Sequence, residues 1–248
     1  EKPLPPITED EIPYDLPEGW EWCRLSDIGE IVSGATPDSM NADYYTNPTK
    51  GIPWITPADM KNSINNYISR GTKDITQAGY NSCSTTLLPP GSVIFSSRAP
   101  IGHIAFAQNE LCTNQGFKSV VPYEFKTASW IFYVLKSKVS DINSRASGTT
   151  FKEVSGKFMS LESFPLPPLA EQQRIVAKVD ELMALCDELK YVDEQPIDHS
   201  NNIISFPAKP ETEDSEPIRM AAQGKVEVQP SKQHEAALDD LLEMMDDD

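Results

Sequence analysis

Two aspartates and a lysine form a pattern in this sequence that could support catalysis. Asp38 follows a proline, and Asp59 stands two positions before Lys61. Two carboxylates can hold Mg²⁺ while a lysine stabilises the attacking hydroxide, as in many nucleases. The pattern is permissive, however, and both aspartates stand in proline-containing turns, where Asp is common because its side chain bonds to nearby backbone. We therefore favour local structural roles, with a Mg²⁺-dependent nuclease as the alternative.

Other catalytic and metal-binding motifs are missing from the sequence. It has no phosphate-binding P-loop, no dinucleotide-binding glycine motif, no nucleophile elbow and no H-E-x-x-H pair. Of its three histidines, His103 opens a predicted strand and is best explained as a structural or surface residue. The four cysteines are far apart and lack C-x-x-C spacing. This spacing favours reduced thiols in a cytosolic protein over a disulfide scaffold or a metal site.

Four polar loops offer a different chemistry. Each combines a cation with a hydroxyl or amide side chain and a glycine, and they span residues 70–73, 96–102, 113–118 and 144–152. In DNA recognition, Lys and Arg neutralise phosphates or bind guanine, Asn and Gln can pair with adenine, and glycine lets the backbone approach closely. Charged loops are usually only solvated, so each loop alone is a weak indication of DNA binding.

The formal net charge of -17 opposes binding of nucleic acid over the whole surface. The acidic residues are concentrated at the two ends. Residues 1–21 sum to -6 and residues 191–248 to -11, whereas residues 22–160 sum to +3 and residues 161–190 to -3. A mildly basic region therefore lies between two acidic flanks, and the charge is compatible with a local DNA-binding site.

The elements that must position these loops show both strand and helix signals. Short β-rich runs bounded by Gly, Pro or Asn predict strands at residues 28–32, 52–55, 93–97, 104–107 and 117–121. Residues 127–143 place apolar side chains on one helical face after a Thr start signal. The predicted fold class is α/β: a mixed domain, followed by a long helix of coiled-coil type and an acidic tail.

A proline-rich run at residues 164–169 ends the domain and precedes that long helix. Residues 170–190 contain no Gly or Pro, and a seam of apolar residues recurs in steps of four and three, as in a coiled coil. The seam consists of Ile175, Val179, Leu182, Cys186 and Leu189. A helix of this length needs a packing partner to persist in water. We favour pairing with a second helix; the alternative is packing onto its own domain.

Both ends of the chain are expected to lie outside the folded domain. Residues 1–21 form an acidic, Pro-rich leader, and the composition of residues 191–248 predicts disorder. Residues 234–245 could form a short amphipathic helix that docks on a partner or shields a basic site, or could be a frayed acidic end. No run is apolar enough for a membrane span or a signal peptide, so we expect a cytoplasmic protein without membrane contact.

A set of motifs resembles a known family. They are, in order, Trp20-Glu-Trp-Cys-Arg-Leu-Ser-Asp-Ile28, Trp54-Ile-Thr-Pro-Ala-Asp-Met60, Ser97-Arg-Ala-Pro-Ile-Gly102, Asn114-Gln-Gly-Phe117, Gly148-Thr-Thr150 and Pro165-Leu-Pro-Pro-Leu-Ala-Glu-Gln-Gln-Arg-Ile175. From residue 16 to residue 190 the chain resembles the specificity subunit of type I restriction-modification systems. The resemblance implies a DNA target recognition domain at 22–164 and a conserved spacer helix at 165–190.

The resemblance also implies a function. In that family the specificity subunit has no catalytic activity and reads one half of a bipartite DNA target. It recruits the methyltransferase subunit, which methylates adenine N6 with S-adenosylmethionine, and restriction subunits join for ATP-dependent cleavage. The implied partners are double-stranded DNA, a methyltransferase subunit, a restriction subunit, and a second copy or second half of a specificity subunit. No cofactor is implied for this chain itself.

The leading hypothesis is therefore a non-catalytic DNA-specificity subunit with its DNA contacts in or near the polar loops. The candidate contacts are Arg70, Lys73, Tyr80, Asn81, Arg98, Asn114, Gln115, Lys118, Arg145, Thr149, Thr150 and Lys152. The alternatives are the Mg²⁺-dependent nuclease that would use Asp38, Asp59 and Lys61, and an interaction or decoy protein with an acidic tail.

Overall fold

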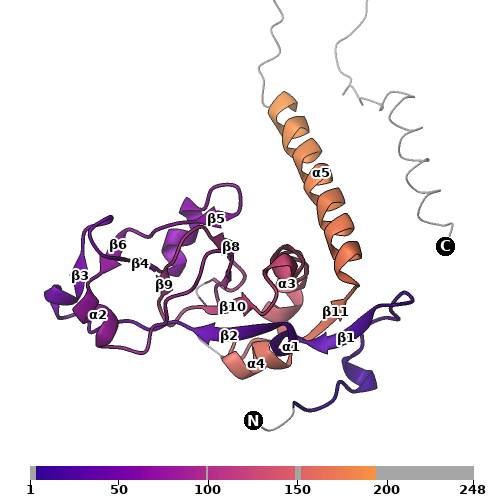
Figure 1. Cartoon of the computed structure of the whole chain (residues 1–248), viewed down its shortest axis with the longest axis horizontal. Coiled ribbons are helices and arrows are strands. Elements are labelled where there is room, and N and C mark those ends of the chain that lie inside the picture. Colours follow the sequence, from indigo (N-terminus) through magenta and orange to yellow (C-terminus); the bar gives the residue numbers. More distant parts are fainter. Residues whose placement is uncertain (1–3, 99, 149–151, 194–248) are drawn as a thin grey trace, which may run out of the picture. The chain divides into compact units, whose positions relative to one another are not determined.

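The computed structural model describes residues 4–98, 100–148 and 152–193, with the elements labelled in Figure 1. Three of the sequence predictions fall outside these residues. They are the DNA contacts Thr149 and Thr150, the disorder of the tail beyond residue 193, and the possible helix at 234–245.

A five-stranded sheet separates two hydrophobic cores. Its order is β2 (Gly29–Ser33), β10 (Lys118–Pro122), β7 (Val93–Phe95), β8 (Ile104–Ala107) and β5 (Tyr67–Ile68), antiparallel except for the parallel pair of β8 and β5. Side chains alternate between the faces of a strand. Val93 and Phe95 accordingly enter one core, and Ile94 enters the other.

Helix α3 (Ala128–Arg145) covers one of these faces. It packs against β7 and β8 and stacks Phe132 on Phe106 with ring centroids 4.6 Å apart. The short helix η4 (Phe125–Thr127) leads into it. The aromatic side chains Phe95, Phe132 and Phe164 are fully buried in this core.

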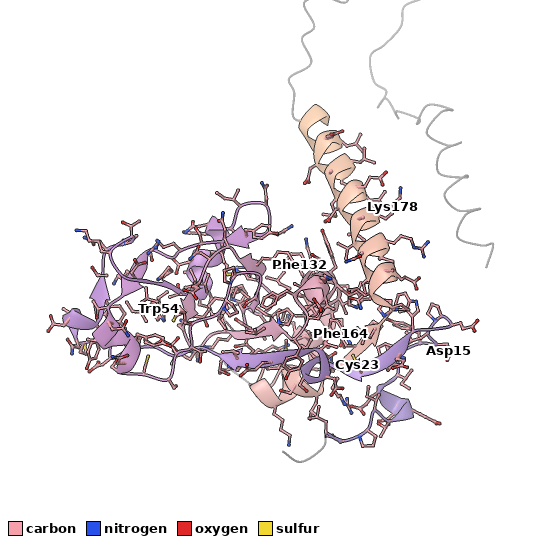
Figure 2. All side chains as sticks on the ribbon, viewed as in Figure 1. Asp15, Cys23, Trp54, Phe132, Phe164 and Lys178 are labelled. Atoms are coloured by element: carbon pink, nitrogen blue, oxygen red, sulfur yellow. The ribbon has the colours of Figure 1, made fainter. Side chains whose placement is uncertain are left out.

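A second, four-stranded sheet, here called the small sheet, has the order β3 (Tyr45–Thr46), β6 (Lys73–Ile75), β4 (Ile52–Ile55) and β9 (Cys112–Thr113). The short helices η2 (Ala42–Tyr44) and α2 (Gln77–Asn81) flank β3 and β6 in the chain. Trp54, Ile75 and Cys112 form a small core of their own, and Trp54 lies apart from Phe132 and Phe164 in Figure 2.

A two-stranded sheet joins the two ends of the domain. β1 (Glu21–Arg24) pairs antiparallel with β11 (Ser163–Leu166), and Trp22 lies opposite Pro165. A proline fits here because each strand has only one neighbouring strand, so its missing N–H removes no hydrogen bond to a second neighbour. The helices α1 (Leu25–Ile28) and α4 (Gly156–Leu161) pack together beside this sheet.

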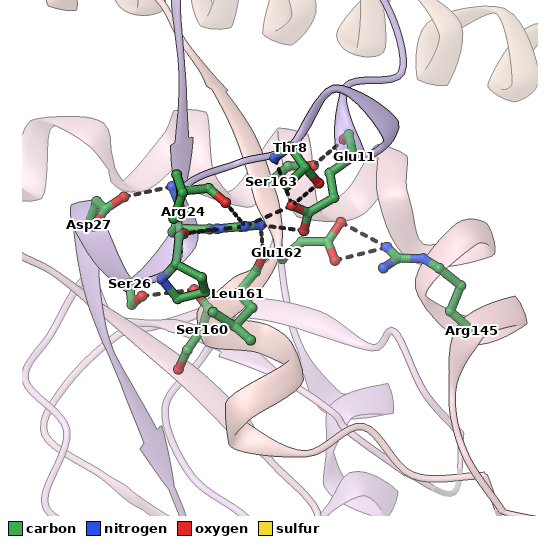
Figure 3. Close-up of polar contacts among 12 residues, drawn as sticks. Thr8, Glu11, Arg24, Ser26, Asp27, Arg145, Ser160, Leu161, Glu162 and Ser163 are labelled. Atoms are coloured by element: carbon green, nitrogen blue, oxygen red, sulfur yellow. Dashed lines mark hydrogen bonds and ion pairs between the residues drawn. The ribbon is translucent and has the colours of Figure 1, made fainter. Parts of the chain in front are cut away.

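The acidic N-terminal segment is anchored by the buried guanidinium of Arg24. It donates to both carboxylate oxygens of Glu11 at 2.8 and 2.9 Å, to Leu161 O at 2.6 Å and to Pro6 O at 3.1 Å (Figure 3). Glu11 ends the short helix η1 (Glu9–Glu11), and its carboxylate also accepts from the backbone N–H of Thr8 at 3.0 Å. Part of the predicted leader therefore packs on the domain.

Helix α5 (Leu169–Asp193) follows the proline run. Its first turn is fixed by buried Gln172, which donates from Nε2 to Pro167 O at 2.8 Å. Ile175 and Val176 pack against the larger core, and Asp180 accepts a hydrogen bond from the Tyr133 hydroxyl. Within the described part of the chain, no helix is long and apolar enough to cross a membrane.

The predicted mixed α/β class is confirmed, and the five predicted strands and two predicted helices occur within three residues of their expected bounds. The short strands β1, β3, β5, β6, β9 and β11 had no counterpart in the prediction.

Candidate nucleic-acid interface

The register of the small sheet brings three loops to one end of it. β4 runs parallel to β9, with Ile55 opposite Thr113, and antiparallel to β6, with Trp54 opposite Lys73. The carboxyl ends of β4 and β9 and the amino end of β6 therefore lie together. We call this the loop end of the small sheet; it comprises residues 56–62, which include the short helix η3 (Pro57–Asn62), and residues 70–73 and 114–117.

Two buried carboxylates hold the 70–73 turn. Asp59 accepts from the backbone N–H of Thr72 at 2.9 Å, and Asp74 accepts from the guanidinium of Arg70. Asp74 is fully buried and also accepts from the backbone N–H of Gly51 at 3.0 Å. The bond from Asp59 holds the backbone of this turn at the loop end, and Asp74 draws the guanidinium of Arg70 toward Gly51, the residue before β4.

The 114–117 turn carries the two candidate amide side chains. The backbone N–H of Asn114 donates to Ile55 O at 2.9 Å, which continues the small sheet by one residue. Asn114 Oδ1 accepts from the N–H of Gly116 at 2.8 Å, and Gln115 Oε1 accepts from the hydroxyl of Thr36. Each amide oxygen thus has a partner within the chain.

Arg98 and Lys118 gather around Glu153 beside this turn. The backbone N–H of Ser97 donates to Gly116 O at 2.8 Å, which places the next residue, Arg98, beside the 114–117 turn. Arg98 Nη1 lies 3.7 Å from one oxygen of Glu153, and Lys118 Nζ lies 3.9 Å from the other. Burial lowers the pKa of Lys118, and Arg98 adds to that shift while Glu153 opposes it. The structure therefore brings together the turns and strand ends that carry six predicted contacts from three of the four loops: Arg70, Lys73, Arg98, Asn114, Gln115 and Lys118.

Other predicted contacts lie elsewhere. Tyr80 and Asn81 belong to α2, which follows the carboxyl end of β6 and therefore stands at the opposite end of the small sheet. Tyr80 packs against the Trp54 core, and Asn81 Oδ1 accepts from Gln77 Nε2 at 3.1 Å.

The guanidinium of Arg145 is engaged by carboxylates. It donates to both oxygens of buried Glu162 at 2.8 Å (Figure 3). It also pairs with Asp141 and lies 4.8 Å from the ring centroid of Phe158. Lys152 Nζ donates to Asn143 O at 3.0 Å. These contacts supply structural roles for Arg145 and Lys152 that the sequence did not indicate.

The residues of the nuclease alternative have local partners as well. Asp59 is buried, and one of its oxygens accepts from the backbone N–H of Thr56 at 2.9 Å and from its hydroxyl at 2.6 Å. Burial raises the pKa of Asp59, but the bonds from Thr56 and Thr72 outweigh burial, so the pKa is lowered overall. Asp38 accepts from the N–H of Met40 at 3.0 Å. In the described ranges, no group of three or more His, Cys, Asp or Glu side chains could hold a metal ion. The favoured interpretation of both aspartates as turn residues that bond to nearby backbone agrees with their hydrogen bonds.

Sequence reasoning missed Asp74, Glu153 and Thr36. Each acts through a contact with a candidate residue rather than as a cation or amide itself. Of the three, only Asp74 could have been inferred from the sequence. It lies next to Lys73 in a short β-rich run, and an acidic side chain in a buried strand needs a partner.

Comparison with known proteins identifies the family. Residues 17–195 match a family model described as type I restriction modification DNA specificity domain. The chain belongs to this family. The specificity subunit of type I restriction enzyme MjaIX from Methanocaldococcus jannaschii is 36% identical over 162 residues, which make up 64% of this chain and 37% of that protein. The EcoR124I/EcoR124II specificity subunit from Escherichia coli is 28% identical over 206 residues, or 77% of this chain and 50% of that protein.

Solved structures of the family have a similar fold. The HsdS subunit from Thermoanaerobacter tengcongensis superposes with a TM-score of 0.57 at 28% identity and covers 73% of this chain and 41% of its own. A chain from a study of complex assembly and conformational transition of the type I R-M system gives a TM-score of 0.60 at 28% identity, over 73% of this chain and 42% of its own. The chain spans half or less of the length of each of these proteins.

Proposed function

We propose that this chain supplies DNA sequence specificity to a type I restriction-modification complex and has no catalytic role itself. Its domain would read one half of a bipartite target. The observation that carries the proposal is the convergence of Arg70, Arg98, Asn114, Gln115 and Lys118 near the loop end of the small sheet, in a chain of the DNA specificity domain family. Cations for phosphates and directed donors for bases are the two requirements of sequence-specific binding.

The amide side chains define what this surface can read. The oxygens of Asn114 and Gln115 each accept a hydrogen bond from within the chain, so their NH₂ groups are the ends directed to other partners. An NH₂ donor suits the acceptors of a major-groove edge, which are N7 and O6 of guanine, N7 of adenine and O4 of thymine. A bidentate contact to adenine would need the oxygen as well, so we favour single donor contacts here.

Helix α5 would supply the assembly surface. Ile175 of the predicted seam packs on the domain, whereas Leu182, Cys186 and Leu189 are exposed, and Leu189 is 60% exposed. Exposed apolar side chains at heptad spacing favour pairing with a second helix, from a second copy or from a second half of a specificity subunit. The conserved-spacer role expected for residues 165–190 corresponds to this helix.

The partners follow from the family. Its curated relatives are named as specificity subunits of type I restriction enzymes, and one similar structure comes from a study of the assembly of such a system. We therefore expect this chain to bind double-stranded DNA together with a methyltransferase subunit, to recruit a restriction subunit, and to act in the cytoplasm. S-adenosylmethionine would be bound by the methyltransferase subunit.

A charge-removal experiment tests the DNA interface. Arg98→Met is placed in the full chain assembled with its methyltransferase subunit, and DNA affinity is measured at several salt concentrations. We expect weaker binding and a salt dependence reduced by about one phosphate contact. Lys50→Met is the matched control, because Lys50 is exposed and belongs neither to the 114–117 turn nor to the cations that gather around Glu153. Equal effects of the two substitutions would refute the proposed interface.

A further inference from the structure

Asp74 is a fully buried carboxylate whose contacts determine how Arg70 is held. Its Oδ2 accepts from the N–H of Gly51 at 3.0 Å and from Nη1 of Arg70. Its Oδ1 is buried and has no hydrogen-bond partner in the described structure. A buried ionised carboxylate requires a cation, so this pair turns Nη1 of Arg70 inward.

The rest of the Arg70 guanidinium stays available. The Arg70 side chain is 28% exposed, and among the described residues only its Nη1 has a hydrogen-bond partner. The remaining nitrogens, Nε and Nη2, point along the other edge of the planar group as a two-donor fork. Such a fork matches the O6 and N7 acceptors of guanine in the major groove.

The backbone beneath Arg70 is held firmly enough to aim that fork. Asp59 Oδ1 accepts from Thr72 N at 2.9 Å, two residues after Arg70. A Cβ atom on Gly71 would lie 2.5 Å from Trp54 O and 2.9 Å from Asp59 Oδ2, so the turn packs directly against β4 and η3. A donor fixed before binding loses little conformational entropy when it meets its acceptor.

The charge of the pair favours a base over a phosphate as the ligand of Arg70. Asp74 compensates the positive charge of Arg70, so the net attraction for a phosphate is small while the directional donors remain. Lys73 differs: its Nζ lies 6.0 Å from the ring centroid of Tyr45 and has no carboxylate partner in the described part of the chain. Neighbouring residues thus offer the two kinds of contact, Arg70 for a base edge and Lys73 for a phosphate.

We propose that Arg70 reads a guanine in the major groove and that Asp74 is the positioning residue that orients it. This inference rests on the proposed function, because it names the base class that Arg70 of the 70–73 turn would recognise. It assigns a specificity role to a buried carboxylate that does not itself touch DNA.

The test uses the full chain assembled with its methyltransferase subunit and a library of target duplexes with randomised positions. Arg70→Lys keeps a cation beside Asp74 but removes the fork. Asp74→Asn removes the charge that orients Arg70. Lys73→Met is the matched control, because it removes a neighbouring cation without altering the pair. Selected sequences are compared position by position, and thermal unfolding of each variant is recorded.

Arg70→Lys is expected to lower the preference for guanine at one position by about 5- to 150-fold while other positions keep their preferences. Asp74→Asn should relax the same position, and the double variant should relax it no further. Lys73→Met should weaken all sequences alike. If Asp74→Asn does not fold, Asp74→Glu replaces it, since it displaces the carboxylate while keeping the charge, and the same relaxation is expected.

Two results would overturn the inference. Unchanged preferences in Arg70→Lys would remove the guanine contact, and a lower unfolding temperature of the Asp74 variant with unchanged preferences would leave Asp74 a purely structural role. A wild-type complex that selects no sequence would instead refute the proposed function, which keeps the two failures distinct.

Discussion

Arg145→Met is predicted to weaken the fold and to leave DNA binding intact. Glu162 is 3% exposed and accepts from Arg145 at 2.8 Å and from Lys138 Nζ at 2.8 Å. Removing one partner of an isolated buried ion pair costs about 3–5 kcal/mol. Here Lys138 remains, and the Arg145 side chain is 43% exposed and therefore screened by water. We expect a loss of about 1–2 kcal/mol, which lowers the unfolding temperature of a folded region of this size by about 2–8 °C.

The assay is thermal unfolding of the full chain, followed by tryptophan fluorescence. Arg174→Met is the matched control: Arg174 is 77% exposed and pairs with Glu171 at 3.2 Å, so its loss should change stability by less than about 0.5 kcal/mol. DNA affinity and its salt dependence are then measured on the assembled complex. An unchanged unfolding temperature together with a salt slope reduced by about one contact would show that Arg145 binds phosphate, and would refute this reasoning.

Three further predictions concern the N-terminal anchor, the loop end and the long helix. The hydrogen bond from Arg24 lowers the pKa of Glu11 from 4.5 to about 2. The stabilisation that ionised Glu11 provides is therefore present above pH 4.5 and is lost as the pH falls toward 2. Glu11→Gln should flatten this part of a plot of unfolding midpoint against pH. Gly34→Ala would place a Cβ atom 2.2 Å from the backbone oxygens of Thr113 and Asn114, so the turn after β9 must move and the DNA affinity of the complex should fall. Ser33 is the exposed neighbour of Gly34, and the control Ser33→Ala should have little effect. Leu182→Asp with Leu189→Asp should abolish self-association or association with a second specificity half in sedimentation experiments, with the unfolding temperature of the domain unchanged; retained association would exclude the exposed face of α5 as the pairing surface.

The elements of this fold could be predicted wherever one residue type or spacing dominates a long enough run. The strand at 52–55 and the helix that begins after Pro168 are examples, because a β-rich run between turn residues and a regular apolar spacing each specify local structure. The pairing of Trp22 with Pro165 could not be predicted from local signals. It joins residues more than a hundred positions apart, and a proline in a strand argues against a strand unless it has a single neighbour.

The candidate site was predicted by residue type but not by arrangement. Loops with cations, amides and glycines were found in the sequence, yet their meeting depends on the parallel register of β4 with β9 and on the antiparallel register of β4 with β6. The same dependence explains Arg145. A loop composition suited to DNA also suits an ion pair, and only the burial of Glu162 beside it shows where the guanidinium is engaged.

The central claim, that this chain specifies one half of a DNA target, is tested most directly by a map of modified adenines. DNA is methylated by the methyltransferase subunit alone, with this chain, and with a chimaera in which residues 17–164 are replaced by the matching segment of a relative. The account predicts that sequence-specific methylation requires the chain and that the chimaera changes the sequence of the half-site read by this domain. The same methylated sequence in all three samples would contradict it.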